Sequence, residues 1–429
     1  MRDMMLAAAL AAVCAHALAA DVSVADFGGA GDGRTDCTDA FARAVAAAAG
    51  GGSVTVPAGE WLTGPIHLKS GVELRLAKGA VVSFKAEPSA FLPAVKTTWG
   101  GVECMNYSPL VYAYGCTNVS ITGEGALFPK MDVWRTWCCR PPKHKEAMMR
   151  LYDWCCRAVP VEERRLSDLP ESNMRPQLVH FNRCRGVRVE GIEIRDSPCW
   201  SVHFFMCRDV EMRGVRSRGT AWNTDGVDVE ASRDVVVENC VFDQHDDGVV
   251  VKSGRDRDGW RLATPSENVV VRNCRFKNAH TMLAVGTEIS GGVRNVVMEN
   301  CEAGAIDLGS GNLFSLKTNR RRGAFIENVR MENCRAGRVK NVVYMDADVE
   351  YQWRNLPNPL GEHHTSVSNI VLRNVRSDVA DRVVWIKGNA AMPFRAVRLE
   401  GVSADKVEKF ASKPVVVENA EVVFAEAGR

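Results

Sequence analysis

Two stretches of the chain decide its fold: residues 233–242 read RDVVVENCVF, and residues 267–276 read ENVVVRNCRF. In both, apolar residues alternate with polar ones and then meet the pair Asn-Cys. Alternation with a period of two is typical of a strand with one buried face. Asn is a residue that turns the chain. Each stretch therefore predicts a strand followed by a turn.

The same phrase recurs along most of the chain, and from Val187 onward its copies are 23 to 41 residues apart. The copies begin at Thr117, Arg185, Arg208, Arg233, Glu267, Arg294, Glu327, Ser368 and, more weakly, Arg395. A strand and its turns cannot bury an apolar face alone, but coils stacked on one another can. The repeats therefore predict an all-β solenoid of stacked coils. A β-sandwich is the competing all-β fold, but its strands would carry no repeated phrase.

Two segments outside the repeats are predicted to contain helix. Residues 36–49 are rich in alanine and are followed by three glycines, which indicates a helix with a glycine end. That helix would cap the open end of the coils, where unpaired strand edges invite aggregation. The repeated phrase stops over residues 131–176, a charged segment with tryptophans, which we interpret as a partly helical insertion. We expect residues 21–429 to form a single catalytic domain.

The first residues predict export. Residues 1–20 read MRDMMLAAALAAVCAHALAA, with an early Arg2, an apolar core and a small-residue pattern at 17–19. This is typical of a signal peptide removed after Ala19 or Ala20; a buried N-terminal helix is the alternative. No later apolar run reaches the roughly 20 residues that span a bilayer. The net charge of +2 gives no global reason to bind nucleic acid or a membrane. We expect a periplasmic or extracellular monomer.

The chain has fifteen cysteines, and their placement predicts two different roles. Cys240, Cys274, Cys301 and Cys334 all follow Asn in the repeated phrase, which predicts small buried residues at one recurring position. The doublets at 138–139 and 155–156 lie in the insertion. They either cross-link one loop or stay free.

Three carboxylates interrupt the repeats at a coil-like spacing. Asp225 lies in WNTDGVDVE, and Asp246 and Asp247 follow 21 and 22 residues later in QHDDG. Residues one coil apart lie about 4.8 Å apart along the backbone, so the spacing predicts a cluster. Three acids so close cannot all ionise, and a protonated acid beside charged ones is what glycosidic cleavage needs. An Asp-rich turn stack and a calcium site are the alternatives. His280 and Lys317, at later coil intervals, add a polar group and a positive charge.

The ordered motifs resemble those of glycoside hydrolase family 28, the polygalacturonase family. Its signatures Asn-Thr-Asp, Asp-Asp, Gly-His-Gly and Arg-Ile-Lys correspond to residues 223–225, 246–247, 279–281 and 315–317. FGGAGDGRTDCTDAF at 27–41 and DDGVVVKSGRD at 246–256 extend the resemblance over nearly the whole mature chain. It implies a single-stranded, right-handed parallel β-helix of the pectate-lyase-like type. It also implies a pectic polysaccharide or oligosaccharide substrate and neither metal nor cofactor.

Carried over residue by residue, the resemblance implies roles for the acids. Asp246 would be the general acid, and Asp225 with Asp247 would hold and activate the attacking water. Direct displacement by that water inverts the anomeric centre. His280 would support the acid or the sugar. Lys317 would bind a substrate carboxylate, and Lys252 would also bind substrate. Asn223 would bind substrate and orient the site, or it only completes a turn.

The chain departs from the family pattern at two motifs. Ala279 and Thr281 replace the glycines beside the histidine, and Ser315 replaces the carboxylate-binding arginine. The second change removes a planar bidentate clamp, because Lys317 alone is a point charge. The arginines at 320–322 either reach in instead or form a solvated basic turn.

Two long segments are placed to wall the site. The insertion and the loop at 346–364 carry aromatic residues that either stack on sugars or pack within their own loops: Trp134, Trp137, Tyr351 and Trp353. Walls favour exo action, and we expect it. The alternatives are a hydrolase of rhamnogalacturonan or of terminal rhamnose, a pectin lyase-type β-helix, and a non-catalytic glycan-binding β-helix.

Overall fold

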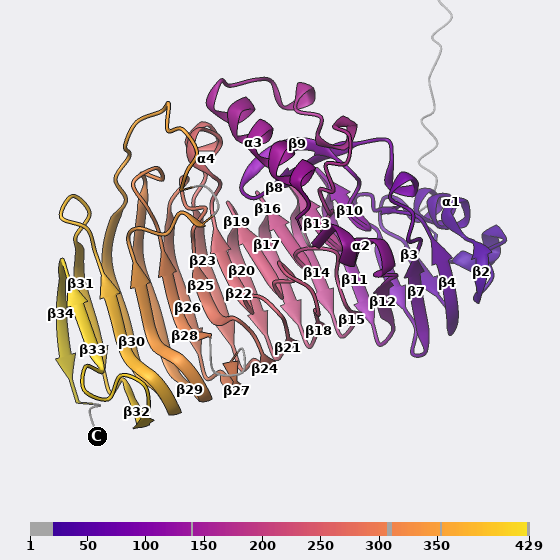
Figure 1. Cartoon of the computed structure of the whole chain (residues 1–429). Coiled ribbons are helices and arrows are strands. Elements are labelled where there is room, and N and C mark those ends of the chain that lie inside the picture. Colours follow the sequence, from indigo (N-terminus) through magenta and orange to yellow (C-terminus); the bar gives the residue numbers. More distant parts are fainter. Residues whose placement is uncertain (1–19, 139, 307–310, 352–353, 427–429) are drawn as a thin grey trace, which may run out of the picture.

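The computed structural model describes residues 20–138, 140–306, 311–351 and 354–426. Thirty-two strands of these ranges join into one continuous sheet, and every pairing within it is parallel. Figure 1 shows the strands as coils stacked along one axis, from indigo at the N-terminal end to yellow at the C-terminal end. The fold is the expected right-handed parallel β-helix and not a sandwich.

Each central coil contributes one strand to each of three columns. The first column contains β10 (Val111–Tyr114), β13 (Val179–Asn182), β16 (Val202–Phe205), β19 (Val227–Glu230), β22 (Val249–Lys252), β25 (Thr281–Val285) and β28 (Asn312–Lys317). The second contains β11 (Thr117–Gly123), β14 (Arg185–Glu190), β17 (Arg208–Arg213), β20 (Arg233–Glu238), β23 (Ser266–Arg272) and β26 (Val293–Glu299). The third contains β12 (Ala126–Pro129), β15 (Glu193–Arg195), β18 (Arg216–Arg218), β21 (Val241–Asp243), β24 (Arg275–Asn278) and β27 (Glu302–Ala305). The repeated phrase of the sequence therefore forms the second column.

The two ends of the β-helix differ from its middle. The first coils are formed by β1 (Val22–Ser23), β2 (Asp32–Asp36), β3 (Ser53–Val56), β4 (Gly59–Thr63), β5 (Ile66–His67), β6 (Glu73–Leu76) and β7 (Ala80–Phe84), with short 3₁₀ turns η1 (Val24–Phe27) and η2 (Pro88–Phe91). The last are formed by β29 (Phe325–Asp346), β30 (Ser366–Lys387), β31 (Phe394–Glu400), β32 (Ser403–Val407), β33 (Val415–Glu418) and β34 (Ala420–Ala425). Helix α1 (Thr38–Ala48) buries Phe41, Ala44 and Val45 against the first coils, as the sequence predicted.

The turn after each second-column strand explains the Asn-Cys pairs. Asn239, Asn273 and Asn300 follow β20, β23 and β26, and Asn333 holds the corresponding place within β29. All four have φ between 52° and 56°, in the left-handed region that Asn tolerates. Each following cysteine is buried in the core, as predicted. In the insertion, Cys138, Cys155 and Cys156 are free and buried, so the structure shows no cross-link among them. Cys139 lies outside the described residues.

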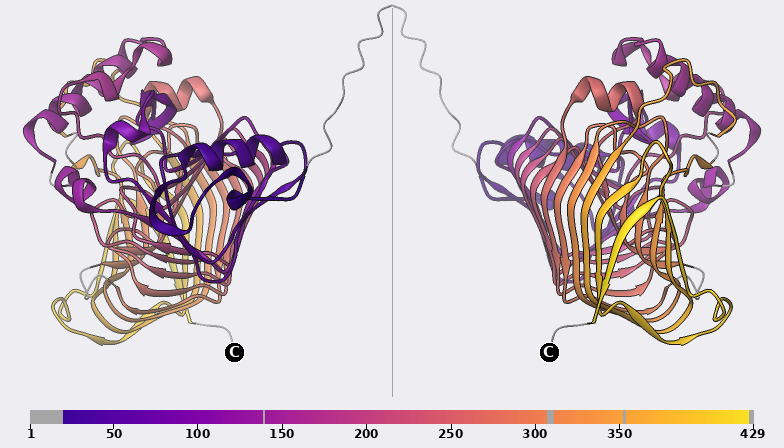
Figure 2. Two further views of the ribbon diagram at one scale, coloured as in Figure 1. Left: turned by 90° about the vertical axis from the view of Figure 1, so that its right-hand side faces the viewer. Right: turned by 90° about the vertical axis from the view of Figure 1, so that its left-hand side faces the viewer.

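The insertion contains the helix that was expected. It forms α2 (Asp132–Cys138), α3 (Pro142–Cys156) and the 3₁₀ turns η3 (Val161–Glu163) and η4 (Leu166–Asp168). Helix α3 packs through its own apolar cluster on the antiparallel hairpin of β8 (Val95–Trp99) and β9 (Val102–Asn106), and it contacts α4 (Asp256–Leu262). Figure 2 shows these helices gathered at one edge of the coils.

The insertion's tryptophans pack within the protein. Trp134 is fully buried, with its ring centroid 5.7 Å from Phe91 and 5.1 Å from Trp137. The hypothesis that Trp134 stacks on sugars is therefore wrong, because the side chain belongs to the main core. Trp353 lies outside the described residues. Within the described ranges, no helix has both the length and the hydropathy needed to cross a bilayer.

Candidate active site

The three acids lie at the turns that lead into the first column of strands. Asp225 lies two residues before β19, and Asp247 lies two residues before β22. Val227 is in register with Val249, so Asp225 and Asp247 occupy the same place on successive coils. A backbone bond from Gly226 N to the Asp247 carbonyl (2.9 Å) fixes this register. The coil spacing in the sequence predicted this cluster.

A glycine follows each of these two acids for a steric reason. A Cβ on Gly226 would lie 2.5 Å from the ring of Phe242, and one on Gly248 would lie 2.4 Å from the ring of Phe276. The two rings stack in the core with centroids 5.2 Å apart. The backbone therefore passes directly over the core aromatics, and the acids lie on the outer side of the coil.

The acids are close enough to act together. One carboxylate oxygen from each of Asp225, Asp246 and Asp247 lies within 4.8 Å of the other two. Asp225 and Asp247 are each 4% exposed, whereas Asp246 is only partly buried. The Asp246 carboxylate is held by the backbone N–H groups of Asn223 (3.1 Å) and Asp247 (2.9 Å). Asp246 is thus the member of the trio that is open to a ligand.

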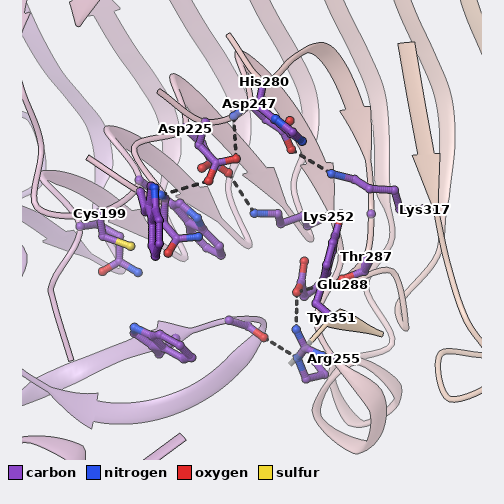
Figure 3. Close-up of a pocket in the computed structure, with 18 of the residues that line it drawn as sticks. Cys199, Asp225, Asp247, Lys252, Arg255, His280, Thr287, Glu288, Lys317 and Tyr351 are labelled. Carbon is purple, nitrogen blue, oxygen red and sulfur yellow. Dashed lines mark hydrogen bonds and ion pairs between the residues drawn. The ribbon is translucent and has the colours of Figure 1, made fainter. Parts of the chain in front are cut away.

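Two buried lysines compensate the charge of the trio. Lys317 Nζ donates to Asp247 Oδ2 at 3.0 Å, and Lys252 Nζ lies 2.5 Å from Asp228 and 3.4 Å from Asp225. Figure 3 shows both ammonium groups pointing toward the carboxylates. Lys252 also lies 3.6 Å from the centre of the Trp200 ring. With these partners, Lys252 is placed to position the acids; its predicted contact with substrate stays a prediction.

Burial and neighbouring charge shift the two buried acids in opposite directions. Burial raises the pKa of Asp225 well above its usual value, and Asp228 and Asp246 add to this more than Lys252 subtracts. Burial also acts on Asp247, but the charge of Lys317, the neighbouring His280 and hydrogen bonds from Lys317 and Thr281 together outweigh it and hold its pKa below the usual value. The cluster therefore favours one protonated and one charged carboxylate, as acid–base chemistry requires.

A second acidic layer lies beneath the trio. Burial raises the pKa of Asp228 to about 7 and that of Glu230 to about 8. Glu230 bonds to His203 Nε2 at 3.0 Å and accepts from Gly254 N at 3.1 Å. This layer touches Lys252 and holds it under the trio.

The trio lies in a cavity of about 390 Å³ that two parts of the chain enclose. Trp99 and Gly100 at the tip of the β8–β9 hairpin and Arg140 between α2 and α3 line one side. Lys317 and Tyr351 line the side toward the C-terminal coils. His280, whose backbone N–H donates to the Asp246 carbonyl at 2.7 Å, also lines the cavity. The predicted catalytic residues therefore share one cavity.

A smaller hollow of about 140 Å³ adjoins the cavity at Ser315. It shares His280, Lys317 and Tyr351 with the main cavity and adds Lys340. This hollow occupies the place where the family pattern has an arginine.

The basic run at 320–322 lines neither cavity. Arg320 pairs with the exposed Glu362 (3.0 Å). Arg321 is buried against Glu350 (3.2 Å), and Arg322 is buried in an ion pair with Asp256. Both hypotheses for this run are therefore wrong for Arg321 and Arg322, because carboxylates distant in the sequence bind them inside the protein.

The sequence analysis did not identify Arg140. It lies in the insertion, outside the repeats, and donates to the Oδ1 of Asn223 at 2.8 Å. Asn223 has φ of 62° and so completes the turn before Asp225 while its side chain accepts from arginine. No spacing rule links residues 140 and 223, so only the structure places them together.

Comparisons with known proteins agree with this geometry. The profile of the family described as "Glycosyl hydrolases family 28" matches residues 166–422. The structure of a hyperthermoactive exopolygalacturonase from Thermotoga maritima is 35% identical, with a TM-score of 0.85, and the match covers 95% of this chain and 92% of that one. A probable polygalacturonase of Vitis vinifera is 24% identical over 91% of this chain and 76% of its own length. An exo-poly-alpha-D-galacturonosidase of Dickeya chrysanthemi is 23% identical over 65% of this chain and 49% of its own length.

Proposed function

Because the chain belongs to glycosyl hydrolases family 28, we propose that it removes sugars from the ends of pectic oligosaccharides by single-step inverting hydrolysis. The observation that carries this proposal is the trio of carboxylates within 4.8 Å, set in a walled cavity. The similarity to an exopolygalacturonase at 35% identity supports exo action. The hairpin and the insertion on one side of the cavity support it too, because a wall stops a polymer from passing through.

We assign the roles of the acids from their exposure and charge. Asp246 reaches the open side, so it protonates the leaving oxygen. Asp247, kept charged by Lys317, and Asp225 hold the water and take its proton. In the free site the proton lies toward Asp225, whose pKa is raised. When substrate and water bind, this proton passes to Asp246, which then donates it to the leaving oxygen.

The remaining residues support this reaction. His280 lines the cavity beside the trio and assists Asp246 or the sugar. Lys317 attracts the carboxylate of an acidic sugar as well as pairing with Asp247. Asn223 fixes Asp246 through its backbone N–H. Lys252 keeps the charge of Asp225 and Asp228 compensated.

The short distance between the acids favours a second candidate mechanism. Inverting glycosidases usually separate their carboxyl groups by about 6.5–9.5 Å, and retaining ones by about 5–5.5 Å. The 4.8 Å cluster is nearer to the second class. A retaining reaction would form a covalent bond between the sugar and one carboxylate. We favour inversion because both buried acids are ion-paired to lysines and together are placed to hold a water.

The test is to incubate the protein with oligogalacturonides of defined length and follow products by mass and by anomeric NMR. We expect single galacturonate units to appear first, as the β-anomer from the α-linked substrate. First release of the α-anomer would establish retention instead. A product with an unsaturated, ultraviolet-absorbing ring would establish a lyase. Turnover of rhamnogalacturonan oligosaccharides alone would show that these, and not oligogalacturonides, are the substrate. Binding without any turnover would show a glycan-binding protein and not an enzyme.

Export is part of the same proposal. A pectic polymer cannot cross a membrane by itself, so the oligosaccharides cut from it are first available outside the cytoplasm. We propose that residues 1–20 are a signal removed on export. The mass of the protein recovered from the medium or the periplasm tests this: an intact Met1 would contradict it.

A further inference from the structure

Two guanidinium groups converge on one neutral oxygen at the side of the cavity that the hairpin and the insertion line, which we call the closed side. Arg140 Nη2 and Arg175 Nη2 lie 2.8 and 3.1 Å from Asn223 Oδ1. Arg175 is 2% exposed and also donates to the carbonyls of Pro198 (2.6 Å) and Trp222 (2.7 Å). Arg175 is thus fixed in place by backbone carbonyls behind Asn223.

Neither arginine forms an ion pair in the described part of the chain. The ion pairs of that part include none to Arg140 or Arg175, and the Nε of Arg140 is enclosed without a hydrogen-bond partner there. Burial lowers the pKa of Arg140, and the positive charge of Arg175 lowers it further. The charge of Asp246 acts in the other direction but does not restore the pKa of Arg140. Two neighbouring positive charges in a partly dry site are costly, so a further anion would be favoured there. The arrangement is therefore suited to a carboxylate ligand.

Arg140 is the member of the pair that a ligand can reach. It lines the cavity beside Trp222 and His245, whereas Arg175 does not line it. Asn223 connects Arg140 to the reaction, because its backbone N–H donates to Asp246 Oδ2 at 3.1 Å. A sugar whose glycosidic oxygen lies at Asp246 is therefore close to Arg140, because Asn223 alone stands between that acid and the guanidinium.

Among the described residues of the opposite side, Arg255 lines the cavity, but its guanidinium is paired with Glu288. Ser315 stands where the family pattern has an arginine, and its hydroxyl lies 3.3 Å from that of Thr281. Arg321 and Arg322 are engaged by Glu350 and Asp256. The planar donor suited to bidentate carboxylate binding is thus supplied at the closed side by the insertion.

We propose that Arg140, held by Asn223 and backed by Arg175, binds the carboxylate of a uronic acid at the closed end of the cavity and selects acidic terminal sugars. The proposal rests on the proposed hydrolysis of pectic oligosaccharides and adds the residue that sets its specificity.

The experiment compares α-linked digalacturonate with the same disaccharide methyl-esterified on the sugar to be released. Arg140→Gln can still donate to Asn223 but is neutral, and Arg140→Lys keeps the charge without the fork. We expect Arg140→Gln to raise KM for the free acid about 10- to 100-fold, to leave kcat within about threefold, and to leave KM for the ester unchanged. Arg140→Lys should recover part of the loss.

The matched control is Arg150→Gln, which alters an exposed arginine of α3 in the same insertion, outside both cavities. It should leave both KM values unchanged, and thermal melting of each variant reports whether the insertion stays folded. An unchanged ratio of acid to ester kcat/KM in Arg140→Gln, or an equal shift in Arg150→Gln, would overturn the proposal.

A failure of the proposed function gives a different result. If the unaltered protein cleaves no uronide, calorimetric binding of galacturonate decides the inference instead. Binding that Arg140→Gln weakens about tenfold or more supports a carboxylate site without the hydrolysis. Binding equal in the two proteins, or absent from both, overturns it.

Discussion

The two sides of the cavity are built in different ways. On the coil side, Asp225, Asp247 and Lys317 lie at strand ends or turns of one column, and parallel register fixes their spacing. On the closed side, Trp99 and Arg140 come from a hairpin and an insertion. The hairpin and α3 share a separate apolar cluster, whereas α2 packs on the main core. The comparison teaches that the repeat carries the proposed chemistry, whereas the non-repeating segments shape what enters. Changes on each side should therefore have different kinetic signatures.

The largest effect is expected on the coil side. Asp246→Asn removes the proton donor but keeps an oxygen for the N–H groups of Asn223 and Asp247. Loss of general acid catalysis typically costs about 10²–10⁴ in rate. We expect kcat on oligogalacturonides to fall by that factor while the melting temperature stays the same. Asp243→Asn, at the end of β21 and outside the cavity, is the control. A variant of Asp246 that keeps a tenth of the activity would remove this acid from the proposed mechanism.

The sequence predicted the coil side because its information is periodic. Alternating apolar residues ending in Asn-Cys define the strand column, and a gap of 21 to 22 residues stacks Asp225 on the acids of the next coil. Outside the repeats, the sequence offered no spacing from which contacts could be predicted. Nothing in the repeats indicates that Trp134 lies in the core or that Arg140 meets Asn223.

The sequence also did not predict which charged side chains are buried in ion pairs. A run of arginines at 320–322 is typical of a solvated turn, but Asp256 and Glu350 lie 66 and 29 residues away and bind two of them inside the protein. Likewise, VVVK at 249–252 predicts a strand but not that Lys252 ends beneath two acids. Such pairings depend on tertiary contacts that a local pattern does not contain.

The next largest effect concerns the stability of the coil side. Lys252→Met leaves Asp225 and Asp228 buried without their cation. Removing one partner of a buried ion pair costs about 3–5 kcal/mol. We expect the free energy of unfolding, measured by urea titration, to fall by this amount. Lys277→Met, which alters an exposed lysine after β24's buried Phe276, is the control. Equal stability of the two variants would mean that Asp228, as well as Asp225, is neutral in the folded protein.

A smaller effect is expected from pH. The pKa of Glu230 is raised from 4.5 to about 8, so folding favours its protonated form. The stability it contributes is fully present below pH 4.5 and is lost as pH rises through about 8. We expect unfolding free energy to fall by about 2 kcal/mol between pH 6 and pH 8. Glu230→Gln keeps the polar group beside His203 and should flatten this profile. A profile that rises with pH, or one that is unchanged in Glu230→Gln, would contradict the assignment.

The smallest effect tests the side of the cavity opposite the insertion. Tyr351 is 58% exposed and lines both the main cavity and the hollow beside Ser315, so we expect a sugar beyond the cleaved bond to contact its ring there. Loss of an aromatic contact costs about 0.5–1.5 kcal/mol. We therefore expect Tyr351→Ala to raise KM about fivefold for a pentasaccharide and less for a disaccharide, with kcat unchanged, whereas Tyr351→Phe keeps the ring and the affinity. An equal loss for both chain lengths would place the ring against the released sugar, and the insertion would then share its role in selecting that sugar with the C-terminal coils.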